Sequence, residues 1–129
     1  MNYNGKKCLV VAGLIAIGSD GAVSENELQL MDRFLRKNGV TAKEEEKILK
    51  EITPRLGSAV SKGNLFREVS KTITTEEKKE VLRFCAGLIL SDMALGKVEA
   101  ETLKKIGIIM GIPARTIQAI IDSEMAGKK

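Results

Sequence analysis

The residues that could carry chemistry in this chain are few, and their types exclude most kinds of catalytic site. The 129 residues include no histidine, which removes histidine-based acid–base catalysis and imidazole ligands for zinc. Ser19 and Ser91 have no neighbour that could activate them as nucleophiles. Cys8 and Cys85 lie in apolar runs outside any Cys-x-x-Cys motif, so we expect buried, reduced thiols. The chain is therefore predicted not to be an enzyme.

Carboxylates are the remaining candidates, and they recur along the chain at a fixed spacing of 72 residues. Asp20 is matched by Asp92, and Glu27 by Glu99. Each Asp follows an apolar segment, and each Glu would lie in the first turn of the next helix. The same spacing also relates Gly39 to Gly111, Val40 to Ile112, Ala42 to Ala114, Ile48 to Ile120 and Leu49 to Ile121. This pattern indicates an internal repeat.

Composition and charge limit the kind of domain that carries these carboxylates and the partners that it can bind. Hydrophobic residues make up 43% and charged residues 29% of the chain, and aromatic residues only 3%. Such a chain forms one domain with an aliphatic core. The net charge is +4, and the excess lies in residues 53–129 without any basic run beyond Lys-Lys pairs. We expect a solvated helical surface from this distribution, so nucleic acid is not an expected partner.

Two apolar segments are predicted to form the central helices. Residues 8–17 have no strongly polar side chain and follow Lys6 and Lys7, which also resembles a secretory signal peptide. The segment is too short to span a membrane. Residues 84–90 have the same character and cannot be a signal, so two buried helices explain both segments. We expect buried packing of Leu14, Ile15 and Ile17 beside Leu88 and Ile89.

Helix start and stop signals divide the rest of the chain. Residues 43–50 are expected to form an exposed helix face with i,i+4 ion pairs. One short helix is expected within 55–73, facing inward through Leu56, Val60, Leu65, Val69 and Ile73. The other signals are capping boxes at Ser24/Glu27, Thr41/Glu44 and Thr74/Glu77, glycines at 39 and 111, and prolines at 54 and 113.

These elements predict an all-α, single-domain seven-helix bundle built from two pseudo-symmetric repeats. The first central helix is expected over 6–18, and the helix after the second acidic segment over 99–110. The domain spans 1–129, with repeat halves at about 6–52 and 75–126 joined by 53–74.

The acidic segment of the first half resembles the TerB-like family. The resemblance rests on residues 14–27, Leu-Ile-Ala-Ile-Gly-Ser-Asp-Gly-Ala-Val-Ser-Glu-Asn-Glu, and on residues 38–41, Asn-Gly-Val-Thr. The family includes the tellurite resistance protein TerB and a domain that precedes the J-domain of the co-chaperone DjlA. In the second half, Met93 stands where the family repeats glycine. The resemblance implies an all-α bundle without catalytic activity and a role in envelope or metal stress.

The resemblance also implies a divalent cation site at the duplicated motif. The matching positions are Asp20, Glu27, Asp92 and Glu99, and Glu101 could replace Glu99 if the second loop is shifted. Oxygen ligands without histidine or thiolate suit Ca²⁺, Mg²⁺ or Mn²⁺. Ordinary turn and capping chemistry explains the same residues without an ion.

Three functions therefore stay open. The first is a cytoplasmic TerB-like module that binds protein partners and a divalent cation. The second is a metal-free protein adaptor, and the third is a nucleic-acid binder that uses basic residues of the second half. No membrane span is expected, and the sequence leaves the oligomeric state open.

Overall fold

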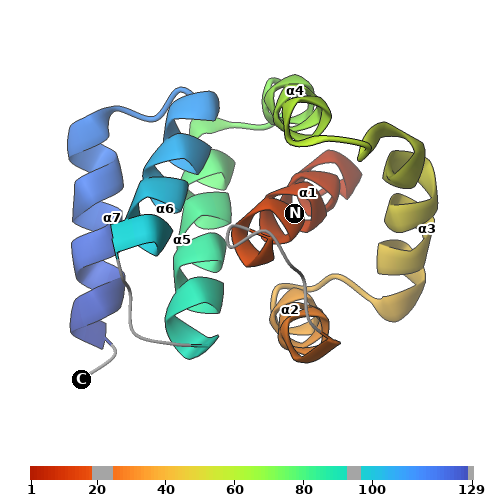
Figure 1. Ribbon diagram of the computed structural model, residues 1–129, viewed down its shortest axis with the longest axis horizontal. Coiled ribbons are helices and arrows are strands. Elements are labelled where there is room, and N and C mark those ends of the chain that lie inside the picture. Colours follow the sequence, from red (N-terminus) through yellow and green to blue (C-terminus); the bar gives the residue numbers. More distant parts are fainter. Residues whose placement is uncertain (19–24, 93–96, 128–129) are drawn as a thin grey trace.

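The protein is entirely helical over the residues that the structure describes. The computed structural model describes residues 1–18, 25–92 and 97–127, without the side chains at 59, 91–92 and 97–99 (Figure 1). These ranges contain no strand, which confirms the all-α prediction. The helices are α1 (Tyr3–Ile17), α2 (Glu25–Lys37), α3 (Ala42–Ile52), a 3₁₀ turn η1 (Thr53–Arg55), α4 (Ala59–Ser70), α5 (Thr75–Asp92), α6 (Lys97–Ile109) and α7 (Ala114–Gly127).

The repeat seen in the sequence is also a repeat of the backbone. The first residues of α5, α6 and α7 each stand 72 positions after the first residues of α1, α2 and α3. The two repeats lie on opposite sides of the molecule, and α4 connects them across the top of Figure 1. The described ranges contain seven α-helices, which are the two related triplets α1–α3 and α5–α7 and the connecting helix α4. This arrangement confirms the expected seven-helix bundle.

The turn after the second helix of each repeat has the same hydrogen-bond geometry. The Val40 N–H donates to the Leu35 carbonyl, and the Ile112 N–H donates to the Gly107 carbonyl, both at 2.9 Å. The glycine inside each turn has a positive φ, 84° at Gly39 and 80° at Gly111. L-residues with a side chain rarely adopt this conformation, so the repeated glycine has a local structural cause.

Side-chain caps fix where several helices begin. The capping box at Thr41 is formed in full, with the Thr41 N–H donating to Glu44 and the Glu44 N–H to the Thr41 hydroxyl. Thr74 and Glu77 exchange the same two hydrogen bonds before α5. At α1, Asn2 accepts a hydrogen bond from the Gly5 N–H at 2.9 Å. This cap places the start of α1 at Tyr3, three residues before the expected Lys6.

The core is centred on α1 and α5, which pack together more extensively than any other pair of helices. They run in the same direction: a Cβ on Gly5 would lie 3.0 Å from Glu77 Oε2, and one on Gly13 would lie 3.2 Å from Phe84 Cε2. Both central helices therefore begin at one end of the bundle and end at the other. Neither these nor the other described helices are long and apolar enough to cross a membrane.

Burial in the central helices agrees with the sequence prediction in part. Ile17, Leu88 and Ile89 are buried as expected. Leu14 and Ile15 are only half-buried against the core, which corrects the prediction for these two residues. A helix that is apolar nearly all round has no polar face to signal which side chains meet the neighbouring helices.

One side chain expected to face inward elsewhere is exposed. Val60 in α4 is 73% exposed. In α4 the burial is instead carried by Leu65, Phe66 and Val69. Val60 lies in the first turn of α4, before the buried part of the helix begins at Leu65.

Candidate functional site

The predicted acidic motifs lie where the first helix of each repeat meets the second. Because α1 and α5 run in the same direction, their C-terminal ends point toward the same end of the bundle. Glu27 is half-buried in the first turn of α2. Asp20 lies outside the described residues, as do the side chains of Asp92 and Glu99. The described residues therefore show that α1 and α5, the helices that precede the motifs, pack side by side, and they do not include three of the four carboxylates.

The cation site stays a prediction. Among the described side chains, no three Asp, Glu or Cys residues are grouped closely enough to hold a metal ion. Three of the four proposed ligands are not in that set, so their convergence is untested. Glu101, the alternative to Glu99, is exposed on α6.

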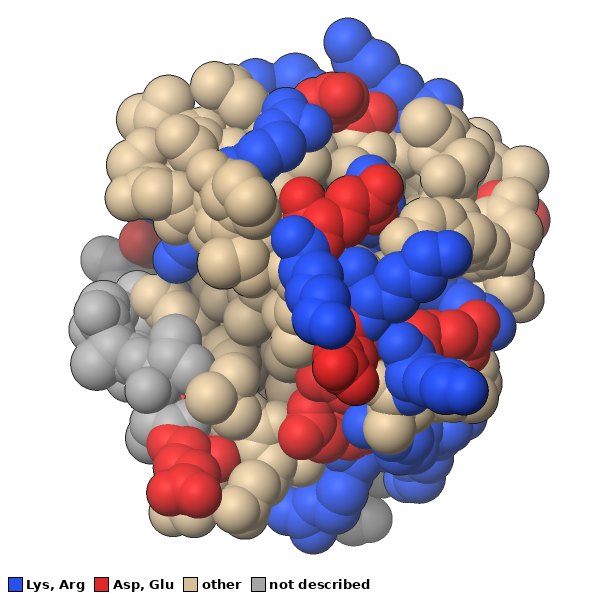
Figure 2. All heavy atoms as spheres, turned by 90° about the vertical axis from the view of Figure 1, so that its right-hand side faces the viewer, with Lys and Arg blue, Asp and Glu red and all other residues tan. Residues whose placement is uncertain are grey.

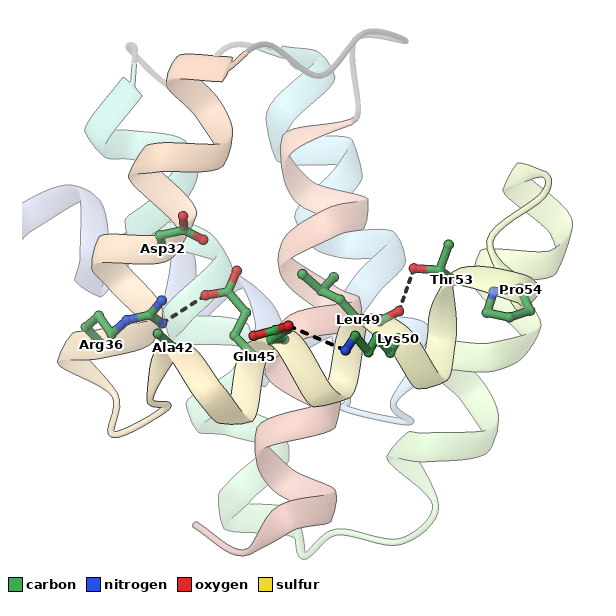
Figure 3. A pocket seen from close by; sticks show the side chains of 9 residues that line it. Asp32, Arg36, Ala42, Glu45, Leu49, Lys50, Thr53 and Pro54 are labelled. Atoms are coloured by element: carbon green, nitrogen blue, oxygen red, sulfur yellow. Dashed lines mark hydrogen bonds and ion pairs between the residues drawn. The ribbon is translucent and has the colours of Figure 1, made fainter.

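A second acidic feature is a hollow between α2 and α3 (Figure 3). Its volume is about 580 Å³, and it opens to solvent. Asp32 and Arg36 project into it from α2, and Glu45 projects from α3 to meet them. The remaining lining residues are Ala42, Glu46, Leu49, Lys50, Thr53 and Pro54.

Glu45 is a buried carboxyl group that has both a positive and a negative neighbour. The residue is only 7% exposed, and its Oε1 lies 2.9 Å from Arg36 Nη1. Burial raises the pKa of Glu45 to about 7, and the neighbouring Asp32 carboxyl adds to the rise, while Arg36 opposes it. The carboxyl group of Glu45 is therefore harder to ionise than that of an exposed Glu side chain.

The equivalent seam of the second repeat has no such polar group. Ile117 occupies the position of Glu45, and Gly107 occupies the position of Leu35. A Cβ on Gly107 would lie 2.6 Å from Ile117 Cδ1, so α7 packs directly against α6 there. At the corresponding place in α2, the buried Leu35 side chain occupies the space beside the backbone that Ile117 fills in the second repeat. This exchange of large and small residues accounts for close packing in one seam and a hollow in the other.

The charged run of α3 is not the uniformly exposed face that its composition predicts. Glu46 and Lys50 form the expected i,i+4 pair at 3.5 Å and are well exposed. Glu44 instead pairs with Lys6 of α1 at 2.7 Å, and the Lys6 ammonium lowers the pKa of Glu44 to about 2. Glu45 is buried, which corrects the prediction for that residue. Its position relative to Ile48 and Ile52, at i+3 and i+7, is the sequence signal that marks the inward face.

The two cysteines are placed where the sequence predicts them. Cys8 and Cys85 are buried and unbonded, as expected. Burial raises the pKa of the Cys8 thiol to about 12 and shifts the Cys85 thiol pKa in the same direction, so neither forms a thiolate at neutral pH. On the α3 side of the molecule, Figure 2 shows basic and acidic side chains intermixed. That face has no continuous basic patch of the kind nucleic acids require.

Comparisons with known proteins give one match. The sequence model of a family described as tellurite resistance protein TerB matches residues 7–122. No curated protein and no solved structure matches the chain. The matched range covers both repeats, including the hollow between α2 and α3 and the ends of α1 and α5.

Proposed function

Because the chain belongs to the TerB family, we propose that it is a non-catalytic binding module of the cytoplasm that serves a metal- or envelope-stress response. In this proposal the module holds a divalent cation at the duplicated acidic motifs and binds a protein partner. The absence of histidine from the sequence and the burial of both thiols support a role without catalysis.

One observation carries the cation proposal: the two repeats have parallel first helices and helix starts in strict register. The motif of the first repeat follows the C-terminal end of α1, and that of the second follows α5. Parallel packing directs both ends to one side of the bundle. Asp20 and Asp92 would be ligands from the loops and helix ends, while Glu27 and Glu99 would be ligands from the first turns of α2 and α6. Carboxylate ligands of this kind suit Ca²⁺, Mg²⁺ or Mn²⁺.

Thermal unfolding of the full chain with added Ca²⁺, Mg²⁺ or Mn²⁺ tests the cation. An ion that binds only the folded protein raises Tm by mass action, and at a hundred times Kd it adds about 2.7 kcal/mol to the free energy of unfolding. Asp20→Asn should abolish the increase in Tm. It should leave the ion-free protein equally stable or slightly more stable, because it relieves repulsion between carboxylates.

Glu76→Gln is the matched control for this experiment. Glu76 is an exposed carboxylate in the first turn of α5, at the opposite end of that helix from Asp92. Its substitution should leave the ion response unchanged. If millimolar concentrations of all three ions leave Tm unchanged, the cation proposal is wrong.

A metal-free adaptor is the second candidate function. It is favoured by the intermixed charges over α3, which suit a polar protein interface (Figure 2). An adaptor would bind the same protein partner in chelator and in divalent ion. A cation-dependent module would lose its partner in chelator, so pull-down under the two conditions separates the candidates.

A further inference from the structure

The hollow between α2 and α3 is lined by both charged and apolar side chains (Figure 3). Asp32 and Glu45 project into it, and Leu49 and Pro54 contribute apolar surface. Leu49 follows Glu45 by one helical turn, so an apolar and an acidic side chain lie next to each other on α3. The volume of about 580 Å³ is that of a pocket for an organic group, and the hollow opens to solvent.

Carboxyl groups outnumber cations among the side chains that line the hollow. Arg36 pairs with Glu45 at 2.9 Å, and Lys50 pairs with Glu46 at 3.5 Å. None of the ion pairs within the described part of the chain includes Asp32. Asp32 therefore adds a negative charge to the hollow that no described Lys or Arg side chain neutralises at close range.

Glu45 presents a second acceptor to the hollow. The residue is 7% exposed, and its Oε1 accepts a hydrogen bond from Arg36 Nη1 at 2.9 Å. No N–H group of the described residues donates to its Oε2. A buried carboxylate needs hydrogen bonds or opposite charge to compensate for lost hydration. Oε2 of Glu45 and the Asp32 carboxylate are therefore acceptors on two helices that a cationic donor entering the hollow would bind.

We propose that the hollow binds an arginine side chain of the protein partner, with the guanidinium group between Asp32 and Glu45 and the alkyl stem against Leu49. This inference rests on the proposed function as a protein-binding module and names the chemistry of one contact. The planar guanidinium group has five N–H donors, which suit carboxyl groups on two helices. Its alkyl stem packs on apolar surface. A metal ion fits less well, because no three described Asp, Glu or Cys side chains are grouped closely enough to hold one.

The equivalent seam of the second repeat has neither the space nor the charge for this ligand. Lys104 occupies the position of Asp32, and Ile117 occupies the position of Glu45. Ile117 packs against the backbone of Gly107, where a Cβ would lie 2.6 Å from its Cδ1. A cationic side chain would meet a like charge and close apolar packing at this place. The second repeat is therefore an internal control within the same molecule.

Titration of the ¹⁵N-labelled full chain with a blocked tripeptide, arginine flanked by two glycines, tests the site. The amide shifts of Asp32, Glu45 and Leu49 should change and saturate, with a Kd on the order of millimolar for a single side chain. The amides of Lys104 and Ile117 should not respond. The same tripeptide with citrulline in place of arginine has the shape of the probe without its charge. It should bind on the order of tenfold more weakly, because it makes no charge-assisted hydrogen bond.

Two variants separate this site from general attraction to a charged surface. Asp32→Asn removes the carboxylate that has no cationic partner, so it should weaken binding of the arginine tripeptide on the order of tenfold. Glu46→Gln is the matched control, because Glu46 is exposed and pairs with Lys50. It should change Kd by less than about twofold. If Asp32→Asn fails to fold, the ¹³C carboxyl shifts of Asp32 and Glu45 in the unmodified protein give the same test, since both should move on addition of the tripeptide.

The proposed arginine site is contradicted if no amide shift saturates, if the saturating shifts lie outside the hollow, or if the arginine and citrulline tripeptides bind alike. It is also contradicted if 1,4-diaminobutane shifts the amides of the hollow and the arginine tripeptide does not, because the ligand is then a free polyamine. A chelator of divalent ions is present throughout. Failure here therefore leaves the divalent cation proposal standing, which Asp20→Asn tests separately.

Discussion

The α2–α3 seam and the α6–α7 seam occupy equivalent places in the two repeats, yet different side chains line each of them. In the second repeat, Ile117 lies against the bare backbone of Gly107. In the first, Leu35 occupies the glycine position and Glu45 the isoleucine position. The helices on both sides begin at matching residues. Two side-chain differences therefore account for a packed apolar seam in one repeat and a polar hollow in the other.

This difference teaches that a repeated backbone does not impose repeated packing between its helices. Capping residues and turn glycines act within a few residues, and they preserve the helix register in both halves. Packing across a seam depends on pairs of residues far apart in the sequence, which diverge without disturbing the register. The second seam is thereby packed closely, and the first leaves a hollow that opens to solvent.

The largest effect should come from truncating the residue at the centre of each seam. Ile117 is 2% exposed, so Ile117→Ala leaves a cavity and should cost about 3 kcal/mol of unfolding free energy. Glu45→Ala should cost less than about 1 kcal/mol, because the Arg36 side chain is 40% exposed and keeps its hydrogen bond to the Val40 carbonyl. Urea unfolding at pH 7 measures both. Equal losses would show that the two seams are energetically alike.

Adding a methyl group at Gly107 should have the next largest effect. Its Cβ would lie 2.6 Å from Ile117 Cδ1 and 2.7 Å from Cγ1, so Gly107→Ala should destabilise the protein by about 1–2 kcal/mol despite its better helix propensity. Gly63→Ala in α4 is the matched control, because nothing lies within 4 Å of a Cβ there. The control should stabilise the protein by up to about 1 kcal/mol. A stabilising Gly107→Ala would contradict the close packing.

The dependence of stability on pH should belong to the first seam. The folded pKa of Glu45 is raised to about 7, so between its unfolded and folded pKa values the folded state binds more protons than the unfolded state. Its contribution is complete below about pH 4.3 and is lost as pH rises through 7, by on the order of 1–2 kcal/mol. Urea unfolding from pH 5 to 7.5 should show this loss in the unmodified protein. The loss should be absent in Glu45→Gln, and its persistence in that variant would assign it to other groups.

The smallest effect should come from the cap of α3. Thr41→Ala removes one half of the capping box and should cost about 1 kcal/mol. Thr74→Ala removes the equivalent contact before α5 and should cost a similar amount. Thermal unfolding followed by circular dichroism measures both. A much larger loss for Thr41→Ala would mean that the cap also supports the neighbouring polar hollow.

The sequence by itself determined the helices and their repetition. Capping boxes at Thr41 and Thr74 act through contacts three residues apart, and Gly39 and Gly111 act through their own backbone angles. Such local causes can be identified without knowing the fold, and the 72-residue spacing then predicted two equivalent halves. The apolar character of residues 8–17 and 84–90 likewise identified the central helices, because burial of that much apolar surface is strongly favoured.

Only the tertiary structure decided which faces meet and which charges are shielded from water. The sequence placed Glu45 on an exposed charged face, although it has the same helical phase as Ile48 and Ile52. In the structure Glu45 is buried. Leu35 stands where the second repeat has Gly107, so α3 does not pack directly against α2 there, and Glu45 lies beside Asp32 and Arg36 in the hollow between the two helices. The tertiary structure also directs α1 and α5 the same way, which local signals cannot specify. Burial, ion pairing and pKa depend on neighbours supplied by other helices, so these properties emerge only when the helices pack.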